Sequence, residues 1–180
     1  MSDCKHIVLM ASYNAWMNDK VYEAAGRLNH AEITRNRGAF FGSILGTLNH
    51  IAVADTIWLR RFAAHPSGFA ALTGVRDVPA PPSLDTPLFA ELAGLAAYRK
   101  TLDGIIQAWA SELAEDDLSR ILSYTSMKGI AAQKRLAGVI MHFFNHQTHH
   151  RGQVTTLLLQ AGEDVGVTDL IALIPDEVLI

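Results

Sequence analysis

Four of the eight histidines lie within nine positions near the end of the sequence, in the stretch HFFNHQTHHRGQV. Neutral imidazole is the commonest metal ligand in proteins, so this stretch could hold a divalent metal ion. A basic surface patch and ordinary packing histidines are the alternatives. His142 and His146 are four residues apart, and so are His146 and His150. Residues four apart on a helix lie about 5–6 Å from each other at Cβ, so the spacing alone leaves two candidate pairs.

The apolar pattern around these histidines favours the second pair. If the stretch is helical, positions 146 and 150 interrupt a stripe that otherwise faces the core: Leu136, Val139, Phe143, Val154 and Leu157. We therefore predict that His146 and His150 share a metal ion. His142 and His149 lie off the stripe, and we expect them to be supporting or solvent-facing neighbours.

A third ligand is expected from a facing helix. Metal sites in helix bundles draw their ligands from several helices, and three protein ligands leave one coordination position open for chemistry. His50 lies in the middle of a long apolar segment, whereas the remaining histidines lie near an end or beside a break in the pattern: His6, His30 and His65. The predicted ligand set is His50, His146 and His150.

Two other kinds of metal enzyme do not fit the sequence. The helices lack the Glu and Glu-x-x-His set that carboxylate diiron sites use. Gln147 stands where the HExxH motif of metalloproteases needs a glutamate as general base. The histidines therefore predict a simple site of three imidazoles.

Helical periodicity runs through most of the chain. Steps of three and four predict a first helix with one polar residue, Asn14, in its apolar stripe: Ile7, Met10, Asn14, Met17, Val21, Ala24 and Leu28. Residues 38–64 are apolar nearly all round and predict the most buried helix. A third helix is predicted over 88–113, with Thr86 as its N-cap and Pro87 as its first residue. A fourth is predicted from near Ala132 to the Ala161-Gly162 pair.

The connections complete the expected architecture. Residues 65–87 hold five of the six prolines, which indicates a long surface connection. It is either a plain crossover or a loop that covers one end of a site. Residues 122–130 are expected to form a small hairpin or an irregular link, and the last eighteen residues a tail along the helices. Four long helices with one long connection between the second and third predict an all-α four-helix bundle, in one domain over residues 1–180.

Composition limits the possible partners. The net charge is −3, and no basic stripe favours nucleic acid. No apolar run approaches the roughly 20 residues that a membrane helix needs, and we see no signal-peptide pattern. Cys4 is the single cysteine and cannot form an internal disulfide. We expect a soluble, cytoplasmic protein that binds neither nucleic acid nor a membrane.

Three stretches of the chain resemble a known family: YNAWMND in the first helix, TLNHIAVADTIWLRR in the second and NHQTHHRGQV in the last. The chain is similar to the DinB-like (DinB/YfiT) superfamily of metal-binding four-helix-bundle proteins. The resemblance implies an up-down-down-up bundle, a homodimer, and a divalent metal such as zinc or nickel. Its ligand positions fall on His50, His146 and His150, the residues that the apolar pattern selects independently.

The resemblance also implies a class of function. Some members of the superfamily are thiol-dependent transferases or isomerases that activate a low-molecular-weight thiol such as bacillithiol or mycothiol. Our leading hypothesis is a metal-dependent enzyme of the thiol-transferase, isomerase or hydrolase type, which activates a thiol or water toward a small-molecule substrate. The alternative is a non-catalytic, metal-stabilised dimeric binding module in a stress response. No carboxylate lies at a spacing from the histidines that identifies a general base.

Other motif residues carry more modest expectations. Asp55 lies about 140° round the helix from His50, so we expect it to pair with a cation such as Arg151, or to form a hydrogen bond at a helix contact, instead of binding the metal. Trp58 is expected in the core and Tyr124 near the mouth of a site. Gly152 indicates a close helix approach, unless its cost of about 1 kcal/mol relative to alanine is simply tolerated.

Overall fold

The computed structural model describes residues 3–176, and most of them are helical. Four long helices dominate the described chain: α1 (Asp3–Gly26), α3 (Ile44–Ala63), α4 (Leu92–Glu112) and α6 (Leu136–Gln160). Shorter elements connect them: α2 (His30–Thr34), the 3-10 helix η1 (Ala70–Asp77), α5 (Glu115–Ser119), the strands β1 (Ile121–Thr125) and β2 (Ala131–Arg135), and the 3-10 helix η2 (Leu170–Leu173). The prediction of a mainly α-helical protein is confirmed.

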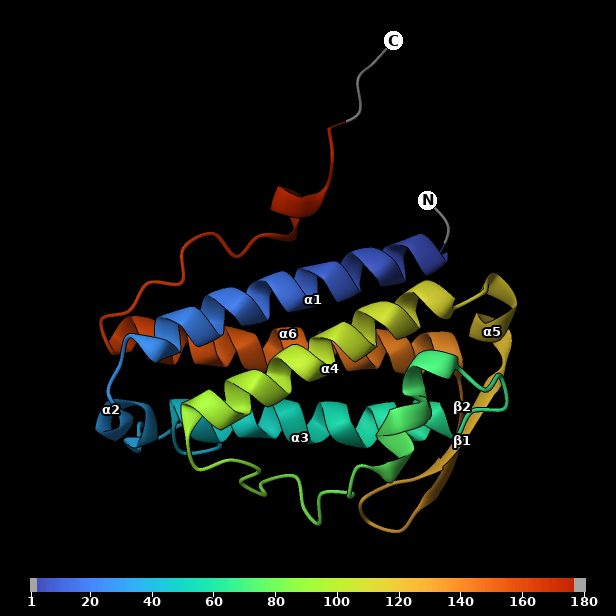
Figure 1. Ribbon diagram of the computed structural model, residues 1–180, viewed down its shortest axis with the longest axis horizontal. Helices are drawn as coiled ribbons and strands as arrows, with labels where there is room; N and C mark the ends of the chain where they lie inside the picture. Colours follow the sequence, from blue (N-terminus) through green and yellow to red (C-terminus); the bar gives the residue numbers. More distant parts are fainter. Residues whose placement is uncertain (1–2, 177–180) are drawn as a thin grey trace.

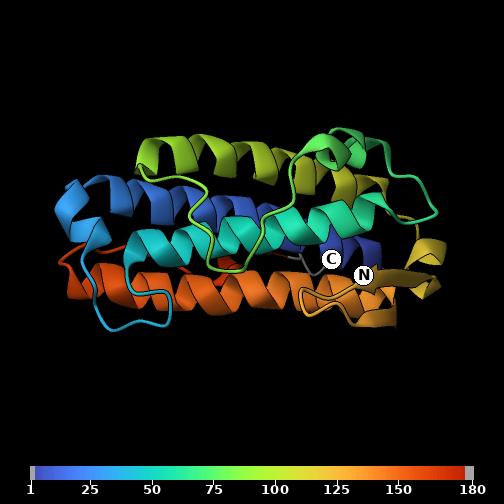
Figure 2. The ribbon, with the colours of Figure 1, turned by 90° about the horizontal axis from the view of Figure 1, so that it is seen from below.

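The long helices pack side by side around one core (Figures 1 and 2). Each of α1 and α3 packs against both α4 and α6. In Figure 1, α1 and α6 run in one direction and α3 and α4 in the other. At the centre, the ring of Phe62 stacks on Trp109 at 4.5 Å between centroids and meets the edge of Phe143 at 5.6 Å. None of the described helices is long and apolar enough to cross a membrane.

Helix α3 begins later than the predicted start at residue 38. Gly38 and Gly42 adopt positive φ angles of 71° and 75°, which are left-handed conformations that break a helix and favour glycine. Ser43 then caps α3, because its side chain accepts a hydrogen bond from the backbone N–H of Gly46 at 3.0 Å. The helix therefore starts at Ile44.

The predicted start of α4 at Thr86 and Pro87 is wrong. The helix begins at Leu92, after Glu91 as its N-cap, and the Thr86 hydroxyl accepts a hydrogen bond from the Ser83 backbone at 3.1 Å. Asn49 of α3 binds the backbone of Phe89 twice, accepting from its N–H and donating to its carbonyl, both at 3.0 Å. These long-range bonds hold the preceding segment against α3.

The predicted start of the last helix near Ala132 is also wrong. Residues 131–135 form strand β2, which pairs antiparallel with β1 in a register that places Ile121 opposite Arg135. The hairpin predicted as one option for residues 122–130 is therefore present, and it extends five residues further than that stretch. Gly129, with φ of 76°, forms part of its turn.

The long connection does more than cross the surface. Its 3-10 helix η1 packs on α3 and α4 and buries Leu72 and Val75. The stretch after it runs below α3 in Figure 1 and loops across the front of α3 in Figure 2. A close helix approach at Gly152 is contradicted, because a Cβ added there would meet nothing within 4 Å, so the alternative of a tolerated glycine holds. At the other end of the described chain, the Tyr13 hydroxyl donates to the carbonyl of Thr168 at 2.7 Å and holds the tail against α1.

Candidate metal centre

The three predicted ligands come together between α3 and α6. His50 lies near the middle of α3, and His146 and His150 lie one turn apart on α6. One ring nitrogen from each lies within 4.8 Å of the others, and the Nε2 atoms of His50 and His146 are 3.2 Å apart. Two nitrogens bound to one tetrahedral zinc ion at 2.0–2.1 Å would be about 3.3–3.4 Å apart. The spacing of the His50–His146 pair therefore fits a shared ion.

Hydrogen bonds orient two of the rings with their Nε2 atoms free for an ion. Nδ1 of His50 lies 2.8 Å from the backbone carbonyl of Leu84, which can only accept, so this nitrogen carries the proton. Nδ1 of His150 lies 2.8 Å from Oε1 of Gln153. A ligating histidine commonly donates its second N–H in this way, which fixes its tautomer and orientation. The lone pair of Nε2 in both rings is then available for coordination.

An aromatic side chain covers one face of the site. The ring of Phe41 stacks on His50 with 3.7 Å between centroids and an angle of 15°, and its edge-on contact with His150 spans 5.6 Å. Phe41 can approach because Gly46 has no side chain: a Cβ there would lie 2.1 Å from the Phe41 carbonyl oxygen. His50 is consequently only 4% exposed.

Burial keeps the three imidazoles neutral. It lowers the pKa of His50 and of His150, and it lowers the pKa of His146 to about 3, with the nearby imidazoles of His150 and His50 adding to the effect. Bringing three cations together at this spacing would be costly. The neutral form is also the one that coordinates a metal, so the chemistry of the donors fits a divalent cation.

The two other histidines of the motif lie beside this group. The exposed His142 ring is 6.0 Å from that of His146 and contacts the edge of Trp58 at 5.4 Å. His149 is exposed, and its ring lies 4.8 Å from that of His150. They are neighbours of the three grouped imidazoles, as the apolar stripe predicted.

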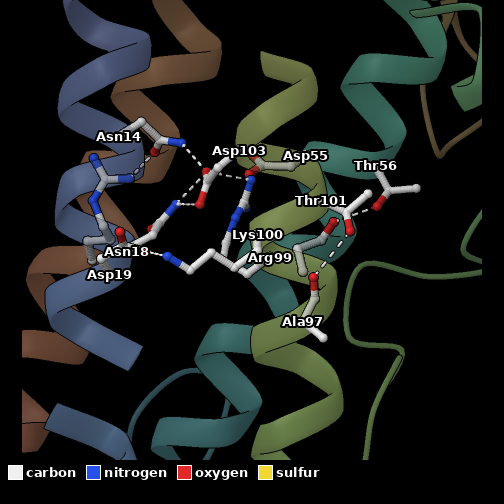
Figure 3. Close-up of polar contacts among 12 residues, drawn as sticks. Asn14, Asn18, Asp19, Asp55, Thr56, Ala97, Arg99, Lys100, Thr101 and Asp103 are labelled. Carbon is white, nitrogen blue, oxygen red and sulfur yellow. Dashed lines mark hydrogen bonds and ion pairs between the residues drawn. The ribbon is translucent and has the colours of Figure 1, made fainter. Parts of the chain in front are cut away.

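A buried polar network joins the four long helices, and Figure 3 shows its contacts around Arg99 and Asp103. Asp55 of α3 pairs with Arg99 of α4, and Arg99 also pairs with Asp103 at 3.0 Å. The Asp103 carboxylate accepts hydrogen bonds from Asn14 at 3.0 Å and from Asn18 at 2.9 Å, both on α1. These contacts link α1, α3 and α4 through the interior.

Asp55 pairs with a cation at a helix contact, as expected, but the cation is Arg99 and not Arg151. Arg99 faces Asp55 from the neighbouring helix, while Arg151, beside His150 on α6, donates to the side chain of Asn14. Burial raises the pKa of Asp55, and the Arg99 guanidinium opposes that shift. The network thus connects the helix that carries His50 with the helix that carries His150.

Some residues around the site were not predicted. Gln153 follows His150 by three positions, a spacing that places the two on one helix face, so the sequence contained a signal for it. The positions of Phe41 and of the Leu84 carbonyl depend on irregular segments that carry no periodic signal. Trp58, expected in the core, is half-buried, and the Tyr124 ring meets its edge at 5.2 Å.

Comparison with known proteins decides the family. A family model described as the DinB family matches residues 1–176. The chain belongs to the DinB family. No curated protein and no solved structure matched the chain. DinB family proteins are generally metal-binding, and here three histidines from two helices of the DinB fold could hold an ion.

Proposed function

We propose that this DinB family protein binds one divalent metal ion, zinc or nickel, through His50, His146 and His150. We further propose that it uses the ion to activate a small-molecule thiol or a water in a transferase, isomerase or hydrolase reaction. The observation that carries the proposal is the convergence of three neutral imidazoles, two of them oriented by hydrogen bonds from Nδ1.

The residues around the site have separate roles in the proposed reaction. An ion bound by three neutral imidazoles would keep its full charge and an open position, where it would lower the pKa of a thiol or water. The Leu84 carbonyl and Gln153 orient the ligands, and the Phe41 ring keeps water from one side of His50. Burial, together with the Glu115 carboxylate, raises the pKa of Cys4 to about 11. A reactive thiol would therefore come from a small molecule.

We also propose that the four long helices form the up-down-down-up bundle of the family and that the protein is a homodimer. The directions of the helices in Figure 1 support the bundle. An apolar concavity between α1 and α6, with Met141 73% exposed at its edge and Phe144 within it, supports a dimer contact. Sedimentation velocity measures the oligomeric state, and a monomer at all concentrations would contradict the dimer.

Metal content tests the site directly. We expect about one ion per chain in the tag-free protein, and its loss in His50→Ala and His150→Ala while helical circular dichroism persists. His142→Ala is the matched control, because it removes an adjacent histidine that lies outside the group, and it should keep the ion. Undiminished metal in the first two variants, or none in the parent protein, would contradict the proposed site.

A second measurement separates an enzyme from a binding module. Metal removal should leave the helices folded if the ion serves chemistry, because the apolar core and the buried network do not depend on it. Addition of a thiol to the cobalt-substituted protein should then change the cobalt absorption. Unfolding on metal removal, with no spectral response to thiols, would favour the non-catalytic, metal-stabilised module.

A further inference from the structure

We propose that Arg61 binds an anionic group, a carboxylate, at the far end of the small molecule that reaches the metal centre. This inference rests on the proposed function and assigns part of its substrate class. Arg61 lies at the C-terminal end of α3 and lines a concavity of about 330 Å³. Residues of α3, of the long connection and of the hairpin also line it: Ile57, Ala80, Pro81, Tyr124 and Met127.

Aromatic rings hold the Arg61 side chain in place. Its guanidinium lies over the ring of Trp58, 4.4 Å from the centroid, and over that of Tyr124 at 4.8 Å. Nη2 donates a hydrogen bond to the carbonyl of Thr125 at 3.0 Å. These contacts fix the plane of the guanidinium and leave other N–H groups of its fork available for a ligand.

Arg61 has no acidic partner within ion-pair distance in residues 3–176. The half-buried Arg37 pairs with Glu32 at 2.7 Å, and the buried Arg99 pairs with Asp55 and Asp103. Burial lowers the pKa of Arg61, and the group that opposes this shift is the Tyr124 phenol, not a carboxylate. A partly desolvated guanidinium without a counter-ion favours an anion, and its planar fork suits a carboxylate.

Arg61 shares a helix face with the metal ligand His50. Eleven residues separate them, which on an α-helix is about 16 Å along the axis and only about 20° of rotation. Ile57 lies between them on that face and also lines the Arg61 concavity. The two sites therefore lie at the two ends of one helix face, with the buried Ile57 between them.

Two further sets of contacts connect these ends. Trp58, beneath Arg61, contacts His142 at 5.4 Å, and His142 lies 6.0 Å from His146, so aromatic rings continue from one end to the other. The long connection borders both ends as well. Its Pro81 lines the Arg61 concavity, and its Leu84 carbonyl binds His50. The favoured ligand is an elongated molecule with a metal-reactive head and a distant carboxylate.

A graded set of thiols tests the inference. The cobalt-loaded protein is titrated with mercaptocarboxylic acids of increasing chain length and with mercaptoalcohols of the same lengths, and the cobalt absorption reports binding. At the chain length that spans the distance from the metal to Arg61, we expect the acid to bind about 10- to 100-fold more tightly than the alcohol. This is the range expected for a hydrogen-bonded charge. Shorter acids should show no such preference.

Variants assign the preference to Arg61. Arg61→Gln should abolish the preference for acids without weakening the binding of the alcohols, and Arg61→Lys should retain part of the preference. Arg27→Gln removes an exposed arginine at the end of α1 and should change nothing. Circular dichroism checks that the hairpin contact to Thr125 is dispensable for folding. Equal affinity for acid and alcohol at every length, or a preference that survives in Arg61→Gln, would overturn the inference.

A second head group separates this inference from the proposed function. If neither the mercaptocarboxylic acids nor the mercaptoalcohols change the cobalt absorption, the proposed thiol activation is wrong. The titration is then repeated with hydroxamates that end in a carboxylate or in an alcohol. Hydroxamates bind open metal ions without thiol chemistry. A carboxylate preference lost in Arg61→Gln then supports the Arg61 site by itself, and its absence overturns that site. A cobalt centre that binds neither thiols nor hydroxamates overturns both the Arg61 site and the proposed function.

Discussion

The imidazole of His50 is restrained on three sides by groups of the protein itself. Its Nδ1 donates to the Leu84 carbonyl, its face stacks on Phe41, and its Nε2 points toward His146. Each restraint removes a rotamer or tautomer that could not coordinate a metal, so less conformational entropy is lost on binding. At the scale of single residues, the site is prepared mainly by groups that are not ligands.

Cys4 illustrates the opposite case, a reactive residue type made unreactive. Burial and the Glu115 carboxylate disfavour the thiolate, and they raise the pKa of the thiol to about 11. We expect alkylation of Cys4 by iodoacetamide, followed by mass spectrometry of its peptide, to accelerate with a midpoint at about pH 11. Glu115→Gln should lower the midpoint, because an anionic neighbour is removed. A midpoint at about 8.5, as for a free cysteine, would contradict this account.

At the scale of the elements, two glycines in helices have different roles. Gly46, in the first turn of α3, lets the loop that carries Phe41 approach, because a Cβ would lie 2.1 Å from a backbone oxygen. Gly152 in α6 is exposed, and nothing lies within 4 Å of an added Cβ. The first glycine supports the candidate metal centre, and the second is tolerated at a cost to the helix.

Alanine substitutions should therefore act in opposite directions. Gly46→Ala should lower the free energy of unfolding by about 1–3 kcal/mol through overpacking, and it should weaken metal binding because Phe41 must move. Gly152→Ala should raise the free energy of unfolding by about 0.5–1 kcal/mol, the helix preference of alanine over glycine. Urea unfolding measures both. Equal stability of the two variants would show that the Phe41 loop yields without cost.

At the scale of the whole molecule, the buried network sets how the long helices meet. Asp55, Arg99 and Asp103 lie in the interior, with side chains 1%, 3% and 6% exposed, and Asn14 joins them to Arg151. Charges of both signs balance one another there. Buried charged groups of this kind are costly to leave unpaired, so packings that separate the helices are disfavoured.

Arg99→Met tests this contribution. The variant leaves two carboxylates buried without their cation, and we expect the free energy of unfolding to fall by about 3–5 kcal/mol. The matched control is Lys100→Met at the next position, which breaks an ion pair with Asp19 whose side chains are 68% and 53% exposed; it should cost less than about 1 kcal/mol. Similar losses in the two variants would contradict a special role for the network.

The sequence by itself determined the helical character and the candidate ligands. Both are local signals: a repeat of 3.6 residues places an apolar stripe on one face, and two histidines in such a stripe must face the interior. The prediction of His50 as the third ligand followed because this residue lies mid-way along a segment that is apolar nearly all round. These patterns depend on neighbours within a few positions, so they can be read without knowledge of the fold.

The tertiary structure alone decided where helices begin and what surrounds the candidate ligands. Residues 131–135 form a strand because they pair with 121–125, and the segment before α4 stays irregular because Asn49, forty positions away, binds the Phe89 backbone. The partner of Asp55, the Phe41 ring on His50 and the unpaired charge of Arg61 likewise depend on residues distant in the chain. Contacts of this kind form only when the helices pack, and no periodic pattern in the sequence records them.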